Sequence, residues 1–234
     1  MEEDTEISIT YSTVSQKLSY TNIDSKTCKV TGVGKCQDTN IVIPEEYNGR
    51  MVTEIRESAF RNNTKIESVT ISRNIDILGQ YSFSGCTNLK KITIYSDNLE
   101  EIGKENFIGN VSFEEFEVNS ENRNYKTIDG ILFSKDDTKI IRYPQGKKDK
   151  EYTIPTTVKE ICIRAIDQNQ YLEKLTILDN VESVGDYAVA LLPKLNTLIV
   201  NAKTFNGIGA FCENYYCTNI EIGSNVKEFL RRRK

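Results

Sequence analysis

The stretch "FSGCTNLKKITI", residues 83–94, carries the pattern that decides the fold. It joins an aromatic residue, a short turn and a strand with alternating apolar residues, and this skeleton returns along the chain. The strand residues Ile71 and Ile94 lie 23 positions apart, and Val118 follows after 24. A unit of this length cannot bury its own apolar residues, but stacked copies can place them in one continuous core. The period therefore predicts a repeat solenoid.

Further features recur in most units. An apolar residue, usually followed by Gly, comes after the strand, and an aromatic residue closes several units at the same spacing, while Cys162 replaces the Gly and Ile166 and Val189 replace the aromatic residue in others. We expect the strands to pair side by side in one parallel sheet of seven or eight strands, with the glycines at bends. The closing aromatics should be buried and stacked in successive coils, and they are Phe60, Phe83 and Phe107.

Four pieces of the sequence together resemble the BspA-like leucine-rich repeats. They are "IVIPEEYNGRMVTEIRESAF" at 41–60, "SFSGCTNLKKITI" at 82–94, "YTIPTTVKEI" at 152–161 and "VGDYA" at 184–188. The resemblance implies a strand-rich α/β leucine-rich-repeat solenoid, with a parallel sheet on its concave face and short turns or helical pieces on the convex side. It also implies, for many members, a place on a microbial or protozoal cell surface and a role in adhesion or in binding host proteins.

The pattern divides the chain into unequal parts. Residues 1–40 are expected to form an N-terminal cap with a hairpin, 41–230 the solenoid and 231–234 a charged, solvated tail. Turn signals within 124–146 separate three short β-rich runs, so this segment should form a β-hairpin insertion that protrudes from one edge.

The cysteines leave the redox setting open. The stretch "KVTGVGK" between Cys28 and Cys36 predicts a hairpin with glycines at its tip, so these two residues either form a disulfide in an oxidising environment or remain free thiols. The spacing of the six cysteines gives no paired C-x-x-C motif, which makes a four-sulfur zinc site unexpected.

Composition excludes several classes of function. The 234 residues contain 30 Lys and Arg against 34 Asp and Glu, so the positive charge typical of nucleic-acid binding is missing. No apolar run is long enough to cross a membrane, and the start at Met1 lacks the pattern of a signal peptide, so neither membrane insertion nor a leader is expected. The absence of His removes imidazole from both acid–base catalysis and metal binding.

The remaining candidates for chemistry are weak. Neighbouring residues such as Glu100 and Glu101 rarely point into one cleft, and they are better interpreted as part of a solvated turn. Ser84 and Cys86 have no His to activate them. The insertion lacks the ligand spacing of a calcium loop. We therefore expect no catalytic site, no metal and no cofactor.

The exposed side of the sheet is the candidate binding surface. Side chains alternate along a strand, so the residues between the apolar ones should face solvent. Thr70, Thr93, Thr153 and Thr176 are expected to share one column, which could serve only to stabilise the sheet. Alternatively, the face binds a ligand through Lys91, Thr93, Tyr95, Glu115, Glu117, Lys174, Thr176, Leu178 and Ile199.

These observations favour a non-catalytic protein-binding or adhesion module. Its expected partner is a protein or a cell-surface glycoconjugate, including one from a host, and the family resemblance implies that the protein is secreted or on the cell surface. A purely structural spacer domain is the alternative, followed by a hydrolase with an unrecognised site.

Overall fold

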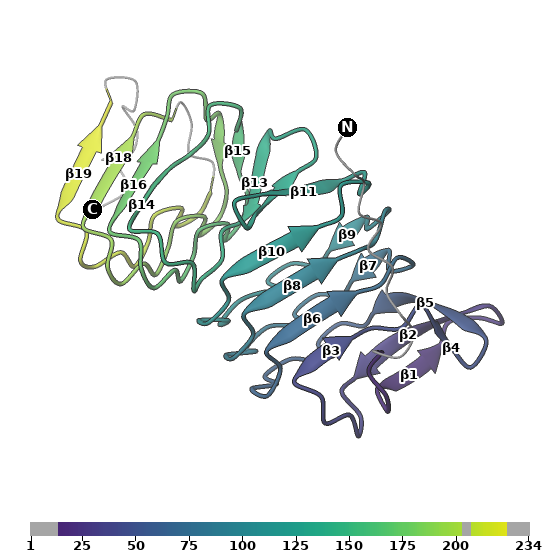
Figure 1. Ribbon diagram of the computed structural model, residues 1–234. Helices are drawn as coiled ribbons and strands as arrows, with labels where there is room; N and C mark the ends of the chain where they lie inside the picture. The colour runs from purple at the N-terminus through teal and green to yellow at the C-terminus, as the bar shows by residue number, and fades with distance from the viewer. Residues whose placement is uncertain (1–13, 203–206, 224–234) are drawn as a thin grey trace, which may run out of the picture.

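The computed structural model describes residues 14–202 and 207–223, which form a solenoid of strands and turns with no helix among them (Figure 1). Strands of successive coils pair in parallel, so the predicted repeat solenoid is confirmed. Of the short turns or helical pieces expected on the convex side, the described residues contain turns and no helix, so the α/β class is wrong for them; the turns bond to the next coil instead of closing into helices. The predicted tail at 231–234 and the start of the cap lie outside the described residues.

Each repeat contributes one strand to a row that we call the principal row. Alternation buries every second residue: in β8, Ile92 and Ile94 are fully buried, whereas Lys91 and Thr93 are only half-buried. The principal row consists of β3 (Asn40–Val42), β6 (Ser68–Ile71), β8 (Lys91–Ile94), β10 (Glu115–Val118), β14 (Glu151–Thr153), β16 (Lys174–Ile177), β18 (Thr197–Val200) and β19 (Asn219–Ile222).

The principal row is interrupted at its middle. Strands β3, β6, β8 and β10 form one four-stranded sheet and β14, β16, β18 and β19 form another, so the expectation of one continuous sheet is wrong. The physical reason lies at the edge of β10, where the N–H of Phe116 donates to the carbonyl of Gly130, 2.9 Å away, and not to a strand of the next coil. Figure 1 shows the two blocks of strands turned relative to each other at this point.

A second row of strands lies on another side of the coil. Most of its members are so short that they contribute only one or two pairs of parallel partners, such as Ile77 with Glu101. The second row consists of β2 (Thr27–Gly32), β5 (Arg50–Ile55), β7 (Ile77–Leu78), β9 (Glu101–Ile102), β13 (Lys139–Arg142), β15 (Glu160–Ile161) and β17 (Ser183–Val184), with β4 (Glu46–Tyr47) antiparallel to β5.

The segment predicted as a protruding hairpin is built into the second row. Its three β-rich runs are strands β11 (Tyr125–Ile128), β12 (Ile131–Ser134) and β13, which form an antiparallel meander. The last of them continues in parallel into β15. Leu132 and Phe133 are almost fully buried, so the segment packs into the core and does not project from it.

The N-terminal hairpin lies elsewhere than predicted. Strand β1 (Ser19–Asn22) pairs antiparallel with β2, and the turn between them is held by the carboxylate of Asp24, which accepts the N–H groups of Lys26 and Thr27 at 2.7 Å each. These bonds lower the pKa of Asp24. Gly32 ends β2 and Gly34 lies in the connection to β3, so these glycines do not form a hairpin tip. Cys28 and Cys36 are both buried and are not joined by a disulfide.

The third side of the coil is a ladder of turns. The N–H groups of Ser58, Phe60 and Asn62 donate to the carbonyls of the next coil at 2.9, 2.8 and 2.7 Å. Ser58 and Asn62 both have positive φ, and the same two positions recur four residues apart in later coils, for example at Arg164 and Gln168. This backbone alternation aims every second N–H at the neighbouring coil and satisfies groups that would otherwise be buried without a partner.

The glycine that follows β7, β9 and β17 is required by close packing between coils, whereas Cys162 follows β15. A Cβ added to Gly79 would lie 2.3 Å from the backbone nitrogen of Glu57, and one added to Gly103 would lie 2.4 Å from that of Gln80. The role predicted for these glycines, a bend, is therefore replaced by close backbone approach.

The predicted aromatic stack is confirmed. The rings of Phe60 and Phe83 lie 5.3 Å apart and those of Phe83 and Phe107 lie 6.3 Å apart, all nearly parallel and all buried. In the C-terminal repeats the same role falls to fully buried aliphatic residues such as Ile166 and Val189. The apolar side chains form two clusters that divide at the meander, with Leu132 in the first and Phe133 in the second.

Truncating the central ring should destabilise the fold strongly. Phe83→Ala should lower the free energy of unfolding by about 3 to 5 kcal/mol, because it leaves a cavity between two stacked rings. The control Thr93→Ala, at a half-buried side chain that faces away from the core, should change it by less than about 1 kcal/mol. Denaturant melts of both variants measure the difference, and a loss near zero for Phe83→Ala would contradict this description of the core.

Candidate binding surface

The predicted site residues all lie on the outward side of the principal row, but the interruption divides them into two groups. Lys91, Thr93, Tyr95, Glu115 and Glu117 belong to the N-terminal block. The C-terminal block carries Lys174, Thr176, Leu178 and Ile199.

In the N-terminal block, one lysine holds two carboxylates of the next coil. The Nζ atom of Lys91 lies 3.1 Å from Glu115 Oε1 and 2.9 Å from Glu117 Oε2. Thr93 Oγ1 donates to Glu117 at 3.3 Å. The hydrogen bond to Glu117 raises the pKa of Lys91, so this lysine stays charged throughout the physiological range.

The C-terminal block is less charged. Lys174 pairs with Glu151 at 3.2 Å. In the neighbouring column of outward residues, Thr153 and Thr176 are followed on the next strand by the apolar Ile199. The predicted single column of four threonines is wrong: Thr70 aligns with Thr93 in one sheet, and Thr153 with Thr176 in the other.

Tyr95 and Leu178 follow directly after their strands and are half-buried. The N–H of Tyr95 donates to Ile71 at 2.9 Å, and its carbonyl accepts from the side chain of Asn119 at 3.2 Å. The backbone at the end of β8 is thus held on both sides, which gives the aromatic side chain a defined position at the margin of the face.

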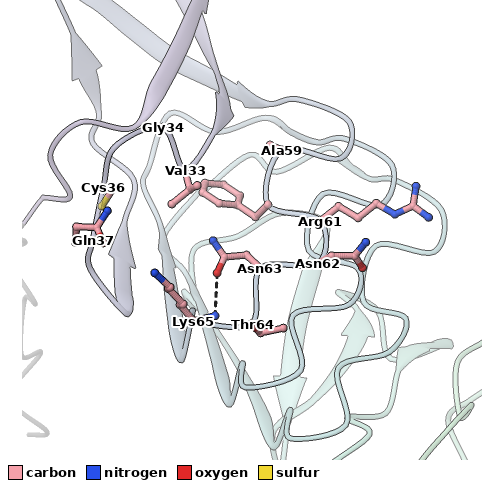
Figure 2. Close-up of a pocket in the computed structure, with 11 residues that line it drawn as sticks. Val33, Gly34, Cys36, Gln37, Ala59, Arg61, Asn62, Asn63, Thr64 and Lys65 are labelled. Carbon is pink, nitrogen blue, oxygen red and sulfur yellow. Dashed lines mark hydrogen bonds between the residues drawn. The ribbon is translucent and has the colours of Figure 1, made fainter.

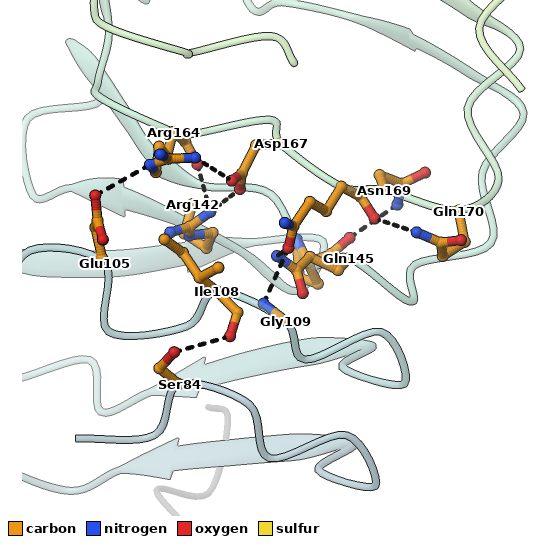
Figure 3. A network of polar contacts seen from close by, with 12 residues as sticks. Ser84, Glu105, Ile108, Gly109, Arg142, Gln145, Arg164, Asp167, Asn169 and Gln170 are labelled. Atoms are coloured by element: carbon orange, nitrogen blue, oxygen red, sulfur yellow. Dashed lines mark hydrogen bonds and ion pairs between the residues drawn. The ribbon is translucent and has the colours of Figure 1, made fainter. Parts of the chain in front are cut away.

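A buried polar network that the sequence did not suggest connects the two blocks (Figure 3). Arg142 forms an ion pair with the fully buried Asp167 and donates to the carbonyl of Arg164. The guanidinium of Arg164 reaches Glu105 of the N-terminal block at 3.3 Å. Gln168 accepts the N–H of Gly109 at 2.9 Å. The turns at 105–109 and 164–168 therefore meet directly although β10 and β14 do not pair.

A shallow cleft of about 460 Å³ lies beside the turn side of the N-terminal block (Figure 2). The Oδ1 atom of Asn63 is occupied by the N–H of Lys65 at 2.9 Å. None of the predicted site residues lines this cleft, which is formed by Val33, Gly34, Cys36, Gln37, Ala59, Phe60, Arg61, Asn62, Asn63, Thr64 and Lys65.

The described residues offer little for catalysis. Burial raises the pKa of the Cys86 thiol to about 11 and that of Cys162 to about 12, so both are protonated near neutral pH. Within the same residues, no group of three or more Cys, Asp or Glu is placed to hold a metal ion. No helix in the described part of the chain is long and apolar enough to cross a membrane.

The comparisons with known proteins agree with the geometry. The family model described as "BspA type Leucine rich repeat region" matches residues 33–141 and 144–232 in six copies. A search of curated proteins found no match.

Three solved structures share the fold. A leucine-rich repeat protein from Bacteroides ovatus has a TM-score of 0.60 at 20% identity, over 92% of this chain and 54% of the other. The Treponema pallidum leucine-rich repeat protein has a TM-score of 0.58 at 20% identity, over 86% and 88%. The pneumococcal vaccine antigen PcpA has a TM-score of 0.56 at 21% identity, over 85% and 66%. The chain thus spans about half of the first of these structures and about two thirds of the third.

Breaking the buried ion pair should cost far more stability than breaking an exposed one. Asp167→Ala leaves the Arg142 guanidinium buried without its counter-ion, so the free energy of unfolding should fall by about 3 to 5 kcal/mol. The control Glu151→Gln removes an exposed pair and should change it by no more than about 1 kcal/mol.

The double variant Arg142→Met, Asp167→Leu distinguishes destabilisation by lost side-chain packing from destabilisation by a buried, unpaired charge. It should recover most of the stability that Asp167→Ala loses, because it buries no charge. If chemical denaturation finds the two variants equally unstable, the unpaired guanidinium is not the cause.

Proposed function

The chain belongs to the BspA-type leucine-rich repeat family, and we propose that it is a non-catalytic protein-binding module that engages its ligand through the outward side of the principal row. The observation that carries the proposal is the arrangement of this side. Mixed charges, Tyr95 and the apolar Ile199 project from strands whose inward residues are fixed in the core. Aromatic and apolar side chains beside charges are typical of protein-binding surfaces.

Rigidity supports binding by this face. Within each block, successive coils are joined by parallel strand pairs in both rows and by the ladder of turns, and contacts between the turns at 105–109 and 164–168 connect the two blocks. A surface held in this way loses little conformational entropy when it binds, and its outward side chains can vary without disturbing the core.

We place the protein on a cell surface or outside the cell, with adhesion as its role. Support comes from the family resemblance and from the likeness in fold to PcpA, which is described as a pneumococcal vaccine antigen. We propose a protein as the ligand. The alternative is a surface glycoconjugate, and the binding assay must distinguish the two.

A structural spacer is the second candidate. It is favoured by the lysines of the face, because Lys91 and Lys174 already bond to carboxylates of neighbouring coils and so contribute to the sheet itself.

The test begins with purified extracellular-matrix proteins and immobilised glycans, against which the chain is assayed by surface plasmon resonance. For each binder, the triple variant Lys91→Ser, Tyr95→Ala, Lys174→Ser should raise Kd at least about tenfold, as expected when an aromatic side chain and two charges are lost from an interface. Thermal melts should show that the variant remains folded.

A matched control makes the same types of substitution outside the principal row. Lys139→Ser, Lys159→Ser, Tyr215→Ala alters two lysines and one exposed tyrosine outside the principal row, and it should leave Kd unchanged. Binding that survives the first variant and fails in the control would move the site away from the principal row. If the chain binds glycans and none of the proteins, the ligand is a glycoconjugate and not a protein.

A further inference from the structure

An open strand edge lies at the centre of the proposed binding face. Strand β14 pairs with β16, with Thr153 beside Thr176. The N–H of Ile154 donates to Thr176, and the carbonyl of Lys150 accepts from Lys174. In a parallel ladder, alternate residues bond to opposite neighbours. The backbone N–H and C=O groups of Glu151 and Thr153 therefore point toward β10, which does not pair with them.

These backbone groups have no partner on that side among the described residues. Exposure agrees with an open edge, because Thr153 is exposed while its column neighbour Thr176 is half-buried. The facing edge of β10 differs, since Gly130 already occupies the N–H of Phe116. Among the described residues, the edge of β14 therefore offers unpaired backbone groups to an incoming strand.

The side chains around the edge carry excess negative charge. Seven carboxylates pair with five lysines there: Lys91 pairs with Glu115 and Glu117, Lys147 with two aspartates, Lys148 with Glu114, Lys150 with Glu173, and Lys174 with Glu151. The outermost carboxylates are well exposed, with 53% of the Glu117 side chain and 69% of the Glu151 side chain accessible. An added strand with basic outward residues would face these groups.

We propose that the edge of β14 binds an extended, basic peptide segment of the partner protein by strand addition. Backbone bonds to Glu151 and Thr153 hold the segment, and lysine or arginine side chains at alternate positions pair with Glu115, Glu117 and Glu151. This inference rests on the proposed function and specifies its ligand as extended polypeptide.

The probe is a fluorescein-labelled ten-residue peptide of alternating Lys and Thr, measured by fluorescence anisotropy against the full chain. It should bind, whereas the same peptide with Glu in place of Lys should not. Thr153→Pro removes the outward N–H without touching the bonds to β16, and it should weaken binding at least about tenfold, because proline on an edge strand blocks pairing. The control Thr153→Val keeps the backbone donor and should bind like the parent.

Two N-methylated peptides test the backbone contact directly, one methylated at every Lys and one at every Thr. A single added strand bonds to β14 through alternate residues, so only one of the two should lose binding. Loss with the Thr-methylated peptide indicates parallel addition, and loss with the Lys-methylated peptide indicates antiparallel addition. Equal affinity of all three peptides, equal loss in both methylated forms, or unchanged binding to a folded Thr153→Pro variant overturns the proposal.

The outcomes also separate this inference from the proposed function. If the Lys91, Tyr95, Lys174 variant loses the protein ligand while Thr153→Pro retains it, the face binds as proposed but not by strand addition. If the peptide binds the edge of β14 and the triple variant retains every protein ligand, the edge is supported as a binding site and the rest of the outward face is excluded as one.

Discussion

The structure depends on the backbone contact between one coil and the next. Along the ladder of turns the N–H groups of residues such as Phe60 have no acceptor within their own coil and bond to the carbonyl of the following one. The coils approach so closely at Gly79 that a single methyl group would meet the backbone of Glu57. An isolated coil would leave these groups unpaired and its apolar side chains in water, so the fold exists only as a stack. Variation is consequently confined to side chains that point outward.

Much of this stack was predictable, because burial repeats with the period of the coil. Ile94 and Phe83 occupy positions that must be apolar in every copy, and both are fully buried. The second row was not predictable, since two-residue strands such as β7 are too short to show an alternation. The interruption was missed for a different reason. Asp129 and Gly130 indicate a turn in the sequence, but no local pattern indicates that the carbonyl of Gly130 will occupy the edge of β10.

The candidate site divides in the same way. Alternation along β8 and β16 was sufficient to place Lys91 and Lys174 outside, whereas their distribution over two sheets depends on the break. The sequence does not predict the pair Arg142 and Asp167, because charged side chains are rarely fully buried and their contact joins positions 25 residues apart. At this junction the meander widens the second row while the turn side stays closed, which is how the two blocks come to lie at an angle (Figure 1).

The ladder of turns also gives the solenoid a net backbone dipole along its axis. The peptide unit joining Gln80 to Tyr81 turns its carbonyl back to the N–H of Ser58 and its own N–H forward to Lys104. Equivalent units repeat this orientation, so their dipoles add along the axis as they do in an α-helix, whereas the dipoles of an ordinary sheet largely cancel. The turn side then carries partial negative charge toward its first coil and partial positive charge toward its last. The cleft beside that first coil is lined by Arg61 and Lys65, the kind of charge that a row of outward carbonyls favours. The backbone of the described solenoid therefore contributes potentials of opposite sign at the two ends of its turn side.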